Sequence, residues 1–222
     1  MLSLVLAESA LELVPSELQN HNSVIAASKR LGKKPSEILL DVSWHFAAMK
    51  GIEDEIKRGR PDLIHFCLLE ACSIPLYFEN KIRIFVHTID NKAIFMGKDV
   101  RLPKSYHRFA GLIEKLYSVG RIEENNKKLL EIKEMNFSSL IKEIKPKKTI
   151  GLSRKGTSSS YQRVAEKVDG DTCIVIGGFA KGHFSDETKK CFDEIVSVDQ
   201  NSLEAHIIIS RLLYEYEKRI IM

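Results

Sequence analysis

Short runs of apolar residues alternate with amphipathic stretches along most of the chain. The runs that predict strands are Leu2–Ala7, Leu63–Cys67, Ile82–Thr88, Thr149–Ser153, Thr172–Gly177 and Glu194–Val198. Those in the second half are continuously apolar, as expected of parallel strands that are buried on both faces. Because such strands alternate with helical stretches, the pattern predicts an α/β fold with a mostly parallel sheet.

Apolar spacing and start signals predict the helices. Ser36 is placed to cap a helix that runs toward Met49, with Pro35 just outside it. Pro103 is expected to open a helix that continues through Tyr117. Further amphipathic or helical stretches are predicted at Ser9–Leu18, Tyr161–Lys167 and Leu203–Lys218.

Two polar stretches separate these elements. Asp90 and Asn91 form a turn signal after the strand Ile82–Thr88, so Ala93–Met96 is predicted to pair with that strand. The lysine-rich stretch Arg121–Lys133 is expected to form a helix or a loop between two halves of the chain.

The length of 222 residues suits one large domain or two small ones. No apolar run is long enough to span a bilayer. The first residues are apolar, but Glu8 and Glu12 follow them quickly, so the start is interpreted as a strand and not as a signal peptide. We therefore expect a soluble, cytoplasmic protein.

The chain has four cysteines, at positions 67, 72, 173 and 191. None forms a Cys-x-x-Cys pair, and their spacings suit no zinc site. We expect free thiols and no metal.

The formal net charge is only +4, but the basic residues are clustered. One group is Lys29, Arg30, Lys33 and Lys34, a second is Lys57, Arg58 and Arg60, and a third is Arg101, Lys104, His107 and Arg108. Each alone suits a solvated face, whereas three together, one of them interleaved with Tyr106 and Phe109, favour a nucleic-acid partner.

Glycine-rich segments follow two predicted strands. They are Gly151–Gly156 and Gly177–Gly182. In open α/β sheets, ligands bind at the carboxyl ends of strands, and glycine lets the backbone approach them closely. Neither segment has the closing Gly-Lys-Ser/Thr of a P-loop or the Gly-x-Gly-x-x-Gly of dinucleotide sites. Tight turns alone would also explain them.

Four longer motifs resemble one known family. They are Leu40-Asp41 with His45 and Ala48-Met49; Arg58-Gly59-Arg60-Pro61-Asp62-Leu63-Ile64-His65; Arg101-Leu102-Pro103 through Arg108-Phe109-Ala110-Gly111-Leu112; and Ile176-Gly177-Gly178-Phe179-Ala180-Lys181-Gly182 with the Ser197–Ala205 segment. These resemble the small-subunit rRNA pseudouridine N1-methyltransferases of ribosome biogenesis, a branch of the knotted α/β (SPOUT) superfamily. The resemblance covers nearly the whole chain.

That resemblance implies a fold and a set of partners. It implies one SPOUT-like α/β domain over residues 1–222, with a C-terminal trefoil knot and a homodimer. It implies that S-adenosyl-L-methionine binds the knot region at about 149–222, and that small-subunit rRNA contacts motifs mainly within 41–112. The reaction implied is N1-methylation of a pseudouridine, together with a contribution to ribosomal subunit assembly.

The resemblance also assigns residues. The cofactor-binding positions would be Leu152, Gly177, Gly178, Gly182, Ser197, Val198, Asp199, Gln200, Asn201, Ser202 and Leu203. RNA contacts would come from Arg60, Arg101, Lys104 and Arg108. Lys104 stands where the family usually has arginine. The compact ammonium charge of lysine there replaces a planar guanidinium, which can contact phosphate through two hydrogen bonds.

Asp62 matches an acid that braces Arg60, and it is also the candidate catalytic base beside that arginine. Pro61 is expected to push the backbone of Arg60 toward extended geometry, which favours an Arg60–Asp62 pair. The histidines that follow apolar runs, His65 and His87, are expected to be structural.

Two other function classes remain open from the sequence. One is an rRNA-binding assembly factor in which methyl transfer is secondary or absent. The other is a nucleotide-dependent α/β enzyme that uses the Gly177 segment for phosphate, although the P-loop lysine is missing.

Overall fold

The computed structural model describes residues 1–98 and 100–221. They form an eight-stranded sheet in the order β4-β5-β3-β2-β1-β7-β6-β8. Its strands are β1 (Leu2–Ser9), β2 (Ile82–Thr88), β3 (Lys92–Met96), β4 (Arg121–Glu124), β5 (Lys127–Glu134), β6 (Lys148–Ser158), β7 (Thr172–Gly177) and β8 (Glu194–Ser197). The pairs among β2, β1, β7, β6 and β8 are parallel, whereas β3, β5 and β4 extend the sheet as antiparallel neighbours. The predicted α/β fold with a mostly parallel sheet is confirmed.

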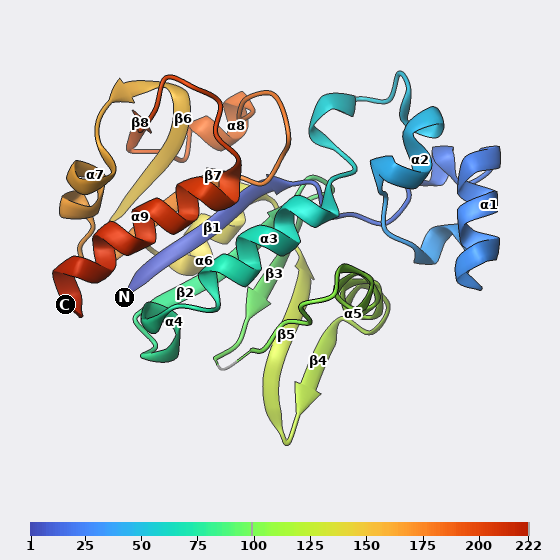
Figure 1. Ribbon diagram of the computed structural model, residues 1–222, viewed down its shortest axis with the longest axis horizontal. Helices are drawn as coiled ribbons and strands as arrows, with labels where there is room; N and C mark the ends of the chain where they lie inside the picture. Colours follow the sequence, from blue (N-terminus) through green and yellow to red (C-terminus); the bar gives the residue numbers. More distant parts are fainter. Residues whose placement is uncertain (99, 222) are drawn as a thin grey trace.

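Helices cover both faces of this sheet (Figure 1). They are α1 (Asn22–Leu31), α2 (Val42–Met49), α3 (Pro61–Ala71), α4 (Pro75–Phe78), α5 (Tyr106–Val119), α6 (Phe137–Ile144), α7 (Tyr161–Lys167), α8 (Asp186–Lys189) and α9 (Ala205–Ile220). In the view of Figure 1, α3 and α9 lie in front of the strands, α5 lies beside β5, and α6 lies behind the strands.

The central strand shows how the chain specifies this layering. Leu4 and Leu6 of β1 belong to the larger core, which α3, α5 and α9 cover. Val5 and Ala7 belong to a second core, which α6 and the phenylalanines near α8 cover. Because successive side chains of a strand point to opposite faces, a continuously apolar strand requires helices on both sides.

A small helical unit, α1 with α2, extends from the sheet and has a core of its own. The helix predicted from Ser36 to Met49 is shorter than expected, because α2 begins after Asp41, whose Oδ1 accepts the N–H of Ser43 at 2.8 Å. Ser36 lies instead in a 3-10 turn, Pro35–Glu37.

The strand predicted at Leu63–Cys67 is wrong, since these residues form the middle of α3. Pro61 occupies the first turn of that helix, where its fixed φ is preorganised and its missing N–H costs nothing. The helix packs on α9 and buries Leu63, Ile64, Cys67 and Leu68.

Two further expectations are corrected. The stretch Arg121–Lys133 is the hairpin β4–β5, whose turn residues Asn125 and Asn126 have positive φ. The helix expected to open at Pro103 begins only at Tyr106, after Ser105, so Lys104 precedes α5 and does not share a helical face with Arg108. No helix within the described ranges is long and apolar enough to cross a membrane.

Candidate functional site

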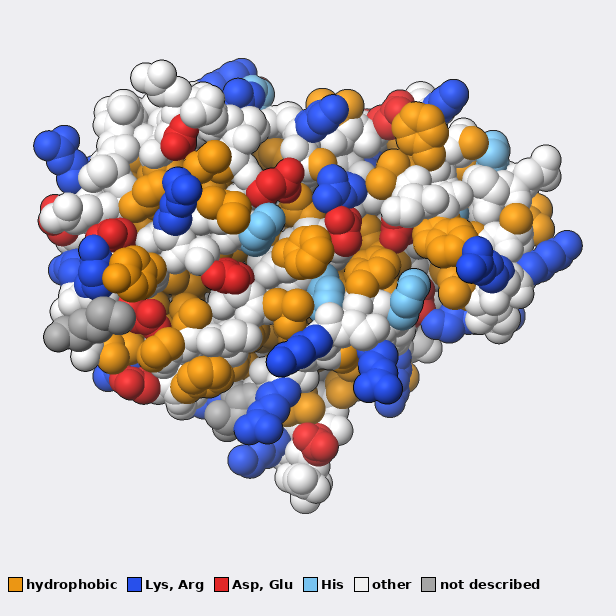
Figure 2. Space-filling view, in the orientation of Figure 1, with side chains coloured by type: hydrophobic (Ala, Val, Ile, Leu, Met, Phe, Trp, Pro, Cys, Tyr) orange, Lys and Arg blue, Asp and Glu red, His pale blue; other side chains and the backbone are white. Residues whose placement is uncertain are grey.

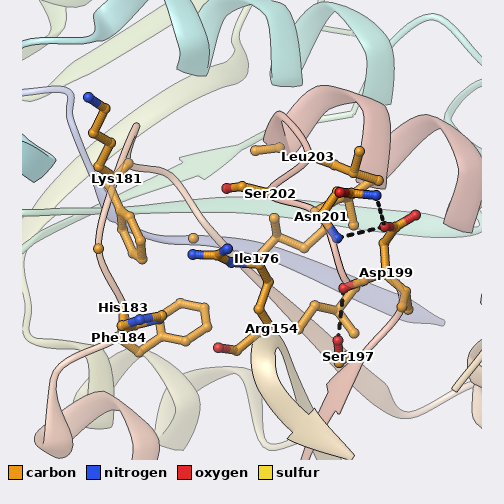
Figure 3. A pocket seen from close by; sticks show the side chains of 18 of the residues that line it. Arg154, Ile176, Lys181, His183, Phe184, Ser197, Asp199, Asn201, Ser202 and Leu203 are labelled. Carbon is orange, nitrogen blue, oxygen red and sulfur yellow. Dashed lines mark hydrogen bonds between the residues drawn. The ribbon is translucent and has the colours of Figure 1, made fainter. Parts of the chain in front are cut away.

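A cavity lined by most of the predicted cofactor residues lies at the carboxyl ends of β6, β7 and β8 (Figure 3). Its volume is about 330 Å³. Parallel strands end at the same edge of a sheet, so segments far apart in the sequence meet there. The predicted residues that line it are Leu152, Gly177, Gly182, Ser197, Val198, Asp199, Asn201, Ser202 and Leu203.

Several lining residues were absent from the prediction. They are Arg154, Ile176, His183, Phe184, Ala205 and Ile208, whereas Ser153, Phe179, Ala180 and Lys181 lie beside Leu152 or within the predicted segment Gly177–Gly182. The side chains of Ile176 and Leu203 face the cavity, and the ring of Phe184 lies across from them (Figure 3). Phe179 and Phe184 meet edge to face, with ring centroids 5.6 Å apart. Apolar surface together with main-chain polar groups suits an organic ligand better than a bare phosphate.

The segment from Ser197 to Leu203 is held by its own hydrogen bonds. Asp199 Oδ1 accepts the main-chain N–H of Asn201 at 2.8 Å and its side-chain amide at 3.1 Å. Ser197 Oγ donates to the carbonyl oxygen of Asp199 at 3.0 Å. The loop therefore keeps a defined shape at the cavity edge (Figure 3). Asp199 is the single carboxylate among the described lining residues.

The glycines of this site have different reasons for being glycine. A Cβ on Gly177 would lie 2.7 Å from the ring of Phe179, beside the cavity. Gly182 has a φ of 105°, which other residues rarely adopt. Gly178 does not line the cavity, because it packs against Ser9, whose Cα would lie 2.8 Å from an added Cβ.

The first glycine-rich segment is not a loop. Gly151 and Gly156 both lie inside β6. A Cβ on Gly151 would meet the ring of Phe192 at 2.5 Å, and one on Gly156 would meet the backbone of Ile195 at 2.5 Å. Close packing explains both glycines. Gln200 lies in a shallower neighbouring pocket and not in the main cavity.

A buried ion pair supports the loop that carries Gly177 and Gly182. Lys57 Nζ contacts Glu8 Oε2 at 2.7 Å, and both side chains are less than a tenth exposed. Glu8 Oε1 accepts the N–H of Ser185 at 2.8 Å, while Lys57 Nζ lies 5.3 Å from the ring centroid of Phe179. The sequence indicated Lys57 only as one member of a basic group, and its role in holding this loop was missed.

The backbone of Glu8 is unusual, with a φ of 51° next to a register shift in β1. A left-handed conformation costs a non-glycine residue about 1–2 kcal/mol. Burial raises the pKa of Glu8, but hydrogen bonds from Lys57 and Ser185 more than offset it and hold the pKa below the ordinary value. Glu8 is therefore an ionised brace between β1 and the loop.

The predicted pair of Arg60 and Asp62 forms at the start of α3. Nε and one terminal nitrogen of Arg60 donate to the two carboxylate oxygens of Asp62, at 2.8 and 2.9 Å. The hydrogen bond to Asp62 raises the pKa of Arg60. The negative charge of Glu204, which precedes α9, also raises it. Arg60 has a ψ of 59° and is not extended as expected. The two hydrogen bonds to Asp62 orient the guanidinium of Arg60.

A tyrosine joins α5 to α2 near this pair. The hydroxyl of Tyr106 donates to Asp41 Oδ2, while Asp41 Oδ1 caps α2. Burial, followed by the hydrogen bond to Asp41, raises the pKa of Tyr106 well above its ordinary value. Tyr106 is therefore a neutral donor that fixes α5 against α2.

Histidine contacts hold the third basic group in place. His65 Nε2 lies 2.7 Å from the carbonyl oxygen of Pro103, and its ring stacks on Phe109 with centroids 4.4 Å apart. The expectation that His65 is structural agrees with these contacts. They attach the segment before α5 to α3.

Arg101 and Lys104 on this segment and Arg108 on α5 are exposed to solvent. Within residues 1–98 and 100–221 none of the three has an acidic partner. Basic side chains gather over this part of the molecular face (Figure 2). All three side chains are therefore open to solvent.

Other members of the predicted basic groups are engaged within the protein. Arg58 makes a bidentate contact with Glu12, with both distances 2.7 Å, and Glu12 is 2% exposed. Lys33 pairs with Glu114. Lys33, Lys57 and Arg58 are therefore weaker candidates for RNA contacts than the composition of their groups indicated.

Comparisons with known proteins agree with this geometry. The family described as EMG1/NEP1 methyltransferase matches residues 4–217. A ribosomal RNA small subunit methyltransferase Nep1 of Thermococcus sibiricus is 38% identical over 219 residues, covering 98% of each chain. The corresponding protein of Staphylothermus marinus is 39% identical, covering 96% of this chain and 93% of its own. The crystal structure of Archaeoglobus fulgidus Nep1 bound to S-adenosylhomocysteine superposes with a TM-score of 0.88, at 35% identity and 97% coverage of both chains.

Proposed function

The chain belongs to the EMG1/NEP1 methyltransferase family, and from this premise we propose that it uses S-adenosyl-L-methionine to methylate N1 of a pseudouridine in small-subunit rRNA. We further propose that it contributes to assembly of the small ribosomal subunit. The observation that carries the proposal is the cavity at the ends of β6, β7 and β8, lined by both the 177–182 and the 197–203 segments.

The residues of that cavity fit S-adenosyl-L-methionine. The apolar side chains of Leu152, Ile176 and Leu203 can cover an adenine ring, and the main chain of 197–203 offers donors and acceptors for its edge. Gly177 leaves backbone exposed where any larger side chain would displace Phe179. The Nep1 structure from Archaeoglobus fulgidus, by its title, holds S-adenosylhomocysteine, which supports this assignment.

When bound, S-adenosyl-L-methionine supplies a methyl group on a sulfonium, and its leaving group is neutral. Positioning of the acceptor nitrogen therefore contributes much of the rate. Arg60 is braced by both oxygens of Asp62, so its remaining donors can orient a uracil carbonyl or a phosphate. Since Asp62 is fully engaged with Arg60, its geometry supports the role of brace more than that of general base.

RNA would bind along the face that carries Arg60, Arg101, Lys104 and Arg108. The last three are exposed and lack acidic partners in the described chain, as expected of groups that contact phosphates. The target base would leave its stack to reach the methyl donor, as bases modified by enzymes generally do.

A homodimer and a trefoil knot belong to the same proposal, and they rest on family resemblance. The apolar face of α9 gives no argument for the dimer, because Ile209, Leu212 and Leu213 are buried against the protein's own core. The same holds for Phe109 of α5, which is fully buried.

Replacing Arg60 or Arg108 by alanine is expected to weaken binding of an rRNA stem-loop by about 1–3 kcal/mol. Removal of one phosphate contact should also reduce the salt slope of binding by about 1. Arg60→Ala should additionally lower turnover at saturating RNA, because Arg60 orients the base, whereas more RNA should largely rescue Arg108→Ala.

The measurements are RNA binding at several salt concentrations, turnover at saturating RNA, and a titration with S-adenosyl-L-methionine. Arg163→Ala, at an exposed arginine of α7, serves as the control and should behave as wild type. Normal RNA binding with lost cofactor affinity in both variants would contradict the division into an RNA face and a cofactor cavity.

A further inference from the structure

A second cavity, of about 340 Å³, lies between the end of α3, the short helix α4 and the segment that leads to α5. It is about as large as the first cavity, and the proposed reaction does not use it. Its lining includes Leu69, Tyr77, Phe78, Arg101, Leu102 and Lys104.

An aromatic ring at this cavity is exposed to solvent. Phe78 is 64% exposed, although its neighbours Leu76 and Tyr77 are buried. These two anchors and Pro75 at the start of α4 hold Phe78 at a fixed place. A single exposed phenylalanine is ordinary. This one differs because it borders a cavity with an apolar floor.

The walls of the cavity are preorganised. The hydroxyl of Tyr77 accepts the N–H of Val100 at 2.9 Å and lies 3.2 Å from the carbonyl oxygen of Gly97. These bonds attach α4 to the segment that carries Arg101 and Lys104. The aromatic ring and the two cations are therefore held together before any ligand binds.

The combination of ring and charge identifies the ligand class. Single-stranded RNA is bound by stacking of unpaired bases on aromatic rings, while cations contact the adjoining phosphates. Arg101 and Lys104 lie at this cavity without acidic partners in the described chain, and an anionic polymer would neutralise both.

We propose that this cavity binds an unpaired nucleobase of the RNA substrate, stacked against Phe78, with its phosphate held by Arg101 and Lys104. The proposal rests on the proposed function. The base is not the methylated one, because α3 separates Arg60 at its start from Cys72 at its end by about 18 Å at 1.5 Å per residue. It belongs to a nucleotide elsewhere in the same loop.

The test uses a stem-loop from the small-subunit rRNA with one pseudouridine in its loop, and a series in which each other loop nucleotide in turn is abasic. Phe78→Ala should weaken binding of the intact RNA between about fivefold and a hundredfold. One abasic position should weaken binding to wild type by a similar factor and have little further effect in Phe78→Ala. Phe78→Trp should retain wild-type affinity.

Tyr214→Ala is a matched control, since Tyr214 is 52% exposed with Lys218 5.2 Å from its ring centroid, yet it lines neither cavity. It should bind RNA as wild type does. Wild-type affinity of Phe78→Ala, equal losses at all abasic positions, or a loss of self-association with normal RNA affinity would each overturn the proposal. If the wild-type protein itself neither binds nor methylates this RNA, the proposed function fails together with this proposal.

Discussion

Replacing Gly177 by valine is expected to abolish binding of S-adenosyl-L-methionine while the fold remains intact. An added Cβ would lie 2.7 Å from the ring of Phe179, so the ring or the new methyl groups must enter the cavity. The clash is with a side chain that can move and not with backbone, which is why folding should survive. Calorimetric titration should show more than a hundredfold loss of affinity, about 2.8 kcal/mol or more.

Two other glycines provide controls for this substitution. An added Cβ on Gly111 of α5 meets nothing within 4 Å, so Gly111→Val should leave cofactor affinity unchanged. A Cβ on Gly178 meets the backbone of Ser9 at 2.8 Å, so Gly178→Val should lower the free energy of unfolding instead. Unchanged affinity in Gly177→Val would refute the assignment of the cofactor cavity.

Breaking the buried pair of Glu8 and Lys57 is expected to have the largest effect on stability. Removal of one partner from a buried ion pair leaves an uncompensated charge, which typically costs 3–5 kcal/mol. Lys57→Met should therefore lower the free energy of unfolding by about that amount, measured by urea denaturation. Because Lys57 also lies over Phe179, and Glu8 holds the N–H of Ser185, cofactor affinity should fall as well.

The double variant Glu8→Gln/Lys57→Met distinguishes loss of the ion pair from the cost of leaving one charge buried without a partner. It should be more stable than Lys57→Met, since no unpaired charge remains. The partly exposed pair Glu215–Lys218 is the control, and Glu215→Gln should change stability by less than about 1 kcal/mol. A loss in Lys57→Met no larger than in Glu215→Gln would contradict the bracing role.

Lowering the pH should weaken the same ion pair, because it protonates Glu8. The pKa of Glu8 is lowered in the folded protein, so its ionised form contributes stability above its ordinary pKa of 4.5. That contribution is lost as the pH falls through the lower, folded value. Stability of the wild type should therefore decline more steeply below about pH 4.5 than stability of Glu8→Gln.

The sheet was predictable where burial leaves a simple pattern. β1, β2, β7 and β8 are short apolar runs, and their predicted ranges match within a few residues. α3 was missed because a five-residue apolar run does not distinguish a buried helix from a strand. Pro61 with Asp62 in the first turn was the signal that could have decided it.

The hairpin β4–β5 was missed for the opposite reason. Its strands are rich in charge, and Glu131 accepts contacts from Arg121 and Lys128 on its surface. A polar edge hairpin shows no apolar run, although Asn125-Asn126 is the kind of dipeptide that allows positive φ at a tight turn. The helix α1 was missed because it buries few residues, all within the small unit with α2.

The candidate site was predictable as loops but not as side-chain contacts. A strand end and glycines pointed to 177–182, and the family resemblance pointed to 197–203; residues of both segments line one cavity. Contacts made across the fold had no local signal. Glu8 with Lys57 and Glu12 with Arg58 span 49 and 46 residues, and their burial depends on the tertiary structure.

The most direct test of the account is methyl transfer from labelled S-adenosyl-L-methionine to matched rRNA stem-loops that carry either pseudouridine or uridine at one loop position. We expect label on the pseudouridine RNA, with N1-methylpseudouridine recovered from the digested product, and none on the uridine RNA, which lacks a free N1. Binding of both RNAs without any methyl transfer, or methylation of the two to the same extent, would contradict it.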